Sequence, residues 1–270
     1  MAPGAVASAT VYASSGLEPG SHRGLPSPWL TFIVSVEGPV RVSGTVEGGS
    51  EFDACTATSY DVMVAGLHPV AAVVEQPSHQ AGVQLALHPL AAPAVLGCRA
   101  ADLVTAGDHG HEVLGREADE LREQVAAAPG DHARLDVVEA WVRRRIDASR
   151  PGTLRPEVVR TWELLARSRG TARIEDVARA VALSPRQLRV LVEREIGLSP
   201  KQLARSFRFD ATIAALTEGR PLAEVATTAG YADQAHLARE FRQMVGCAPT
   251  TWLAEERRNI QDGAHRNRPG

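Results

Sequence analysis

Aromatic residues make up only 4% of the 270-residue sequence, which contains just three cysteines. Cys55, Cys98 and Cys247 are far apart and form no CxxC or Cys/His spacing, which argues against a cysteine-based metal site and indicates reduced thiols. No run approaches the roughly 18 apolar residues of a membrane span. The start, MAPGAVASATVYASSG, lacks a basic segment and a Leu-rich core, so we expect no signal peptide and a cytoplasmic protein.

Motifs of the common enzymes are missing as well. The sequence has no GxSxG, P-loop, HExxH or paired-carboxylate pattern. His22, His68, His79 and His88 lie in a valine-rich part of the chain, but without an HxH spacing or a nearby carboxylate. We therefore expect no catalytic residue, no metal, no cofactor and no enzymatic activity.

Charge is unevenly distributed within the formal net charge of −3. Residues 1–150 contain 10 Arg and 18 Asp or Glu, a net charge of −8. Residues 151–270 contain 19 Lys or Arg and 14 Asp or Glu, a net charge of +5. A basic half favours a polyanionic partner, so the C-terminal half is the candidate for binding nucleic acid.

The hydrophobic pattern also changes along the chain. Up to about Leu90 the apolar segments are short, rich in valine and separated by Gly, Pro and Ser, as in strands of a β-sandwich or barrel. After Pro89 the period is that of helices. Strands are expected in TVYAS, WLTFIVSV, VRVSGTV, DVMVAGL, VAAVVEQ and GVQLALHP, and helices in PLAAPAVLG, HEVLGREADELREQVAAA and DHARLDVVEAWVRRRID. In the last segment Leu135, Val138, Val142 and Ile146 form one apolar stripe, either a dimer seam or part of the core.

These patterns predict an α+β protein of two domains. Residues 1–150 would form a β-rich effector-sensing or dimerisation domain with trailing helices. The segment 151–156 would be a linker, because the stretch SRPGTLRP is rich in proline. Residues 157–258 would be all-helical, and residues 259–270 a disordered tail.

The helical half contains one small unit twice. ALSPRQLRVLVEREIGLSP begins at Ala182, and AGYADQAHLAREFRQMVGCAP begins at Ala229. An offset of 49 residues superimposes four pairs of positions: Leu188 and Leu237, Val192 and Phe241, Gly197 and Gly246, Pro200 and Pro249. Each copy reads as a short helix, a turn and a second helix, at about 174–196 and 222–245.

Local signals support that interpretation. Ser184 and Asp233 can cap the second helix of each copy, and Gly197 and Gly246 can end it. A linker helix opening at Pro200 spans about 25 Å at roughly 1.5 Å per residue. With the width of the two units added, the second helices would lie about one DNA turn, roughly 34 Å, apart.

The faces opposite the buried stripes carry Arg, Gln and His, which suit phosphates and base edges of a major groove. This arrangement is that of a helix-turn-helix. Two such units predict a protein that enters two successive major grooves of double-stranded DNA.

Residues of about 157–256 resemble the DNA-binding domain of the AraC/XylS family of bacterial transcription regulators. The stretch EVATTAGYADQAHLAREFRQMVGCAPTTW closely follows that family's signature, including Phe241-Arg242, Gly246 and Pro249. Val190 stands where members often carry an Arg, so base reading by the first unit is either weakened or directed at a thymine methyl. With Lys201 of the linker helix added, the expected DNA-binding residues are Arg186, Gln187, Arg189, Lys201, Gln234, His236, Arg239 and Arg242.

The first 150 residues are similar to the sensing and dimerisation regions attached to such domains, of actinobacterial type. We therefore expect a sequence-specific transcription regulator under the control of an unknown small-molecule effector. RNA polymerase and a second copy of the chain are further candidate partners, and no membrane is expected. The alternatives are a regulator that acts through protein contacts without an effector, and an enzyme fused to a DNA-binding domain.

Overall fold

The structure, a computed structural model, describes residues 4–47, 51–104, 107–149 and 154–261. Of the predicted linker 151–156, residues 151–153 lie outside these ranges. Residues 262–270 of the predicted tail also lie outside them. No helix among the described residues is long and apolar enough to cross a membrane.

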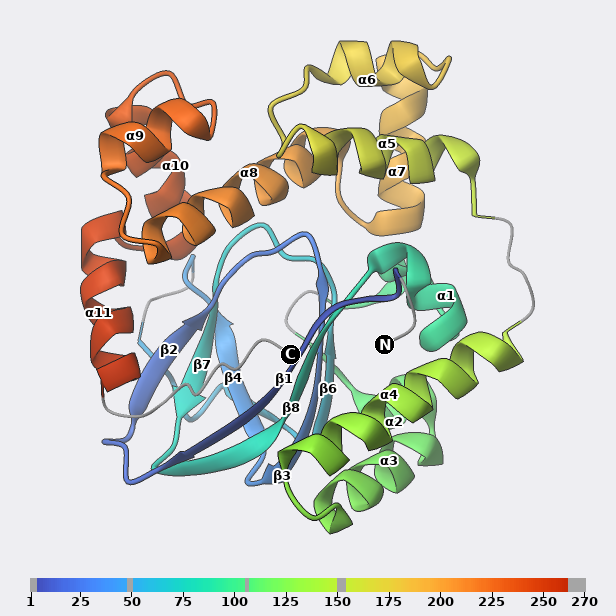
Figure 1. The fold of residues 1–270 in the computed structure, drawn as a ribbon, viewed down its shortest axis with the longest axis vertical. Coiled ribbons are helices and arrows are strands. Elements are labelled where there is room, and N and C mark those ends of the chain that lie inside the picture. Colours follow the sequence, from blue (N-terminus) through green and yellow to red (C-terminus); the bar gives the residue numbers. More distant parts are fainter. Residues whose placement is uncertain (1–3, 48–50, 105–106, 150–153, 262–270) are drawn as a thin grey trace.

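Two antiparallel sheets form the N-terminal part (Figure 1). One has the order β1-β8-β3-β6-β9 and the other β2-β7-β4-β5. The predicted β-rich fold is therefore confirmed. The strands are β1 (Val6–Ser15), β2 (Gly20–Gly24), β3 (Leu30–Glu37), β4 (Val40–Thr45), β5 (Thr58–Tyr60), β6 (Val62–Ala65), β7 (Ala72–Gln76), β8 (His79–Leu87) and β9 (Asp108–His109).

Successive residues of a strand point to opposite faces of a sheet. Successive residues of β3 are apolar and buried, so the five-stranded sheet is apolar on both faces. Phe32 and Val34 of β3 belong to the largest core cluster, together with side chains of the helices. Ile33, between them, packs with Met63 of β6 and Val42 of β4 in a smaller cluster that includes residues of both sheets. The five-stranded sheet is thus covered by the second sheet on one side and by helices on the other.

The helices that follow complete the N-terminal part: η1 (Pro89–Ala91), α1 (Ala92–Val95), η2 (Ala100–Asp102), α2 (Gly110–Leu114), α3 (Arg116–Ala127) and α4 (Asp131–Ala148). In α4, Val138 and Val142 are buried, and Trp141 stacks on Phe32 with ring centroids 5.1 Å apart. Glu117 of α3 accepts hydrogen bonds from Trp141 Nε1 at 2.8 Å and from Arg145 at 3.0 Å. The apolar stripe of α4 therefore belongs to the core of the chain.

The C-terminal part is all-helical, as predicted. Its helices are α5 (Pro156–Arg167), α6 (Ile174–Ala180), α7 (Pro185–Ile196), α8 (Pro200–Thr217), α9 (Leu222–Thr228), α10 (Gln234–Val245) and α11 (Pro249–Gln261). Helix α11 runs to Gln261, so residues 259–261 are helical where a disordered tail was expected. Trp252 near the start of α11 is buried against Phe241, and this packing fixes the first turn from which the helix continues.

The helical part rests on the sheets and on η1 and η2 (Figure 1). Trp162 of α5 contacts the rings of Trp29 and His88, with centroids 5.5 and 4.5 Å apart. At the other end the Ala71 N–H donates to the Met244 carbonyl at 2.6 Å. One continuous apolar cluster therefore joins the five-stranded sheet to α5, α6, α7 and α8.

Candidate nucleic-acid interface

Helix α7 is held by the local signals expected from its sequence. Ser184 accepts a hydrogen bond from the Gln187 N–H, and the Gln187 side chain accepts one from the Ser184 N–H, which forms a capping box. Leu188 and Val192 are buried on its inner face. Gly197 ends the helix in the left-handed region, at φ 90°. The opposite face of α7 is left exposed.

Helix α10 is built in the same way. Asp233 caps it by accepting from the His236 N–H, and Gly246 ends it at φ 83°. Leu237 and Phe241 are buried among the helices of the second unit. The two long helices of the repeat are therefore equivalent elements at opposite ends of α8, and we call α7 and α10 the reading helices.

The predicted DNA-binding residues of α7 lie on its exposed face, but two of them are engaged within the helix. The Gln187 side-chain oxygen is used by the cap, which leaves its amide hydrogens as donors. Arg189 Nε donates to Glu193 at 2.8 Å. Arg186 makes no ion pair within the described residues.

A shallow groove of about 360 Å³ lies between the exposed face of α7 and the start of α5. Three arginines contribute to it, of which Arg155 and Arg194 were not among the predicted site residues. Leu183, Val190 and Leu191 supply its apolar part. The groove thus combines a small apolar surface with an excess of positive charge. Its lining residues are Arg155, Glu157, Leu183, Arg186, Gln187, Val190, Leu191 and Arg194.

The exposed face of α10 is chemically different. Gln234, Arg239 and Arg242 are exposed, and neither arginine forms an ion pair with any described residue. His236 is half-buried in the first turn of α10, where its Nδ1 accepts from the Ala232 N–H of the preceding loop at 3.3 Å. Because Nδ1 is an acceptor, the ring proton resides on Nε2. The structure therefore places His236 at the edge of this face, within α10 and bonded to the loop that precedes it.

Lys201 is exposed in the first turn of α8. It belongs to neither reading helix, so its ammonium group suits a phosphate contact better than a base contact.

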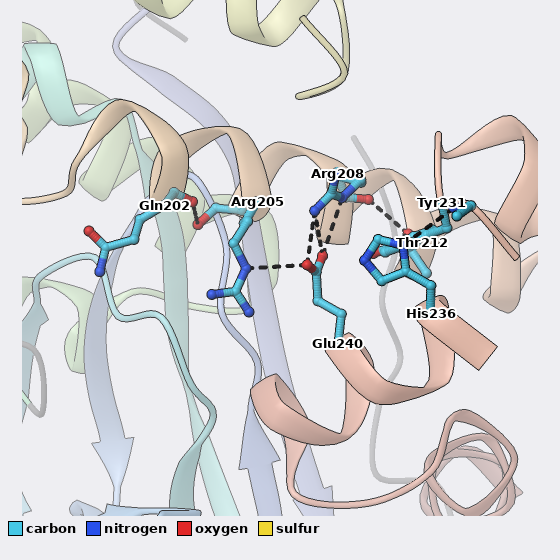
Figure 2. Close-up of polar contacts among 9 residues, drawn as sticks. Gln202, Arg205, Arg208, Thr212, Tyr231, His236 and Glu240 are labelled. Atoms are coloured by element: carbon cyan, nitrogen blue, oxygen red, sulfur yellow. Dashed lines mark hydrogen bonds and ion pairs between the residues drawn. The ribbon is translucent and has the colours of Figure 1, made fainter. Parts of the chain in front are cut away.

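A buried ion pair that the sequence analysis missed joins α10 to α8 (Figure 2). Both carboxylate oxygens of Glu240 accept from Arg208 at 2.9 Å, and Arg205 Nε lies 3.4 Å from Glu240. The Arg208 guanidinium also lies over the ring of Tyr231, 4.9 Å from its centroid. Glu240 lies three residues after Leu237 and one before Phe241, on the buried face. A charged residue on the buried face of a helix was the sequence signal that could have indicated this ion pair.

Tyr231 is buried beside this ion pair. Burial raises the pKa of its hydroxyl group, which keeps the group neutral. The ring packs edge-on against His236 with centroids 5.4 Å apart. Tyr231 and Glu240 together therefore fix the orientation of α10 relative to the linker helix.

Comparisons with known proteins agree with this geometry. Residues 177–255 match a family described as helix-turn-helix domains. ToxT from Vibrio cholerae strain SCE256, solved with an unsaturated fatty acid, is 12% identical with a TM-score of 0.52 over 92% of this chain and 96% of that chain.

Two further solved structures have lower TM-scores. ToxT from Vibrio cholerae O395, bound to (E)-4-(8-methylnaphthalen-1-yl)but-3-enoic acid, is 14% identical with a TM-score of 0.49, over 91% and 97% of the two chains. The C-terminal domain of AraT, a response regulator from Geobacillus stearothermophilus, is 24% identical with a TM-score of 0.36, over 38% of this chain and 88% of that chain. Among curated proteins none matches.

The class defined by this fold and site is a β-rich N-terminal part joined to a DNA-binding helix-turn-helix region. That region is of the AraC/XylS type, which confirms the resemblance of its sequence motif. Residues 177–255 accordingly form a helix-turn-helix region of the kind that binds DNA.

Proposed function

We propose that the protein binds a specific DNA sequence by placing α7 and α10 in two successive major grooves on one face of a duplex. The observation that carries this proposal is the pair of equivalent, capped helices at the two ends of α8, each buried on one face and exposed on the other. Helix α8 has 18 residues, so it is about 27 Å long. That length suits a separation of one helical turn of DNA, roughly 34 Å between the reading helices.

The residues proposed to contact DNA fall into three groups. Arg239 can pair bidentately with a guanine, and Gln234 with an adenine. Arg186, Lys201 and Arg242 supply positive charge for phosphates. Gln187, Arg189 and His236 complete the set from positions where they already make contacts within the chain.

We further propose that a small molecule bound by the N-terminal part controls DNA binding. Two observations support this proposal. A structure of the same two-domain fold holds an unsaturated fatty acid. In this chain the N-terminal part contacts the C-terminal end of each reading helix. A ligand that shifts the N-terminal part would therefore shift both reading helices.

Cytoplasmic location and contact with RNA polymerase belong to the same proposal. We also propose a homodimer. Val138 and Val142 cannot form its interface, because these side chains are buried within the chain.

Selection of bound duplexes from a random library by the purified full-length protein tests the function. We expect enrichment of a site with two half-sites. With about five to seven phosphates neutralised, log affinity against log salt should have a slope of roughly −5 to −6. The absence of any enriched sequence would contradict the proposal and favour a regulator that acts through protein contacts.

A further inference from the structure

The internal repeat provides a direct comparison of the two reading helices. The offset of 49 residues that superimposes Leu188 on Leu237 also places Val190 opposite Arg239 and Glu193 opposite Arg242. At the two positions where α10 exposes cations, α7 carries a methyl-bearing apolar side chain and a carboxylate. The two helices have the same frame but different outer faces.

The contacts of the neighbouring side chains strengthen this difference. Arg189 is the arginine closest to Val190 in the sequence, and its Nε donates to Glu193 at 2.8 Å. This i,i+4 pair satisfies Glu193, which would otherwise repel phosphates, and restrains Arg189 on the helix surface. The centre of the α7 face therefore has no unpaired cation comparable to Arg239.

Val190 itself is unusually exposed. With 61% of its surface accessible, it is the most exposed large hydrophobic side chain of the described residues, followed by Val104 at 52% and Leu154 at 39%. It lines the groove beside α5 together with Leu183 and Leu191. Contact with an apolar group of a partner would remove this side chain from water and so stabilise the complex.

Charge decides what kind of partner fits. Arg186 and Arg194 lie one helical turn before and after Val190, and Arg155 lines the same groove. Only three side chains supply the apolar part of this surface, far less than the roughly 800 Å² that each partner of a stable protein interface buries. A major groove offers the matching pattern, with phosphates on both sides and the 5-methyl group of thymine as the one apolar group among its base edges.

We propose that Val190 reads a thymine through contact with its 5-methyl group, while Arg186 and Arg194 bind the flanking phosphates. The inference rests on the proposed function and makes it more specific. Helix α10 selects bases by hydrogen bonding, and helix α7 selects by apolar contact.

Replacing thymine with deoxyuridine removes this methyl group alone and leaves the Watson–Crick pair and the O4 acceptor unchanged. On the enriched duplex, the half-site of α10 is the one whose preference is lost in Arg239→Ala. Each thymine of the other half-site is then replaced in turn, and the affinity of the full-length protein is measured. We expect one replacement to weaken binding about fourfold, as for the loss of one buried methyl group.

The Val190→Ala variant supplies the decisive comparison. It should bind the thymine duplex about as weakly as the wild type binds the deoxyuridine duplex, and it should lose nothing further on the deoxyuridine duplex. Val104→Ala, at a similarly exposed valine of the N-terminal part, should keep the wild-type response. Because Val190 is exposed, its variant should retain the circular dichroism spectrum of the wild type.

The outcomes separate the inference from the function on which it rests. Failure to enrich any duplex contradicts both. An enriched duplex without a uracil-sensitive thymine in the α7 half-site overturns the inference alone. A thymine whose replacement by deoxyuridine weakens the binding of wild type and Val190→Ala equally also overturns the inference. Unchanged DNA affinity of Val190→Ala would assign this face to another partner and would also overturn it.

Discussion

At the scale of single residues, the two reading helices differ in how far their arginines are already engaged. Arg189 is paired with Glu193, whereas Arg239 and Arg242 form no ion pair with described residues. An unpaired guanidinium keeps its donors for a ligand, and its planar fork matches the O6 and N7 atoms of guanine. Base discrimination should therefore depend mostly on α10.

Replacing Arg239 with alanine should cost about 1–3 kcal/mol on the selected site and relax the preference at one base pair. Arg242→Ala serves as the matched control, since it should weaken specific and random DNA alike and reduce the salt slope by about 0.9. Competition binding against singly mutated duplexes distinguishes the two. An Arg239→Ala protein with unchanged base preference would exclude Arg239 as a base reader.

His88 is a residue whose surroundings predict a response to pH. It lies against Trp29 and Trp162, and its Nδ1 accepts from the Leu90 N–H at 3.1 Å. Burial lowers the pKa of His88 to about 4. Protonation would place a charge in this aromatic cluster and remove the acceptor that caps η1.

The sign of the pH effect follows from proton binding. Between the unfolded pKa near 6.5 and the folded pKa of about 4, only the unfolded chain binds the proton, so stability falls as pH falls through this window. The loss due to His88 should be about 3 kcal/mol. Urea unfolding at pH 7 and pH 4 should show it, and His88→Asn should remove most of it, whereas His132→Asn at an exposed site should not. An equal pH dependence in His88→Asn would contradict this assignment.

At the scale of secondary-structure elements, the joint between α8 and α10 depends on one buried carboxylate. Glu240→Gln leaves Arg205 and Arg208 without their counter-charge, which should lower the free energy of unfolding by about 3 kcal/mol. It should also weaken DNA binding, because α10 loses its fixed orientation. Glu224→Gln breaks an exposed pair with Arg220 and should change stability by less than about 1 kcal/mol. Equal melting curves of the two variants would contradict a structural role for Glu240.

Helix α4 provides a test of the core on the other side of the molecule. Val142 is buried beside Trp141, so Val142→Asp would bury an unpaired charge and should destabilise the chain by more than about 2 kcal/mol. Ala140→Asp, on the exposed face of the same helix, should change stability by about 0.5 kcal/mol or less. Thermal melting followed by circular dichroism compares them. A stable Val142→Asp protein with a weakened dimer would indicate a seam instead.

Elements with strong local signals were predictable from the sequence, and the others were not. The N-cap residues Ser184 and Asp233 and the terminal glycines Gly197 and Gly246 place α7 and α10, and Pro200 places the start of α8. Strand β2, GSHRG, has no apolar alternation and exists because it pairs with β7, a long-range contact without a local signal. The partners of Glu240 were likewise invisible, because Arg205 and Arg208 meet it only after the second unit packs on α8.

At the scale of the whole molecule, the N-terminal part contacts both reading helices at the same position of the repeat. A Cβ atom at Gly197 would lie 3.1 Å from Ala101, and one at Gly246 would lie 3.0 Å from Val46. Both glycines have positive φ angles, at the C-terminal ends of α7 and α10. The N-terminal part therefore helps to set the separation of the two helices, a geometry suited to control by a ligand.

The most direct test of two-groove binding is the effect of spacing on affinity. The selected duplex should contain half-sites centred about 10 base pairs apart, and one chain should occupy both. Inserting five base pairs between them turns one half-site to the opposite side of the helix. Affinity should then fall at least about tenfold, because one reading helix loses its base contacts. Affinity that is unchanged by the insertion would contradict the placement of α7 and α10 in successive major grooves.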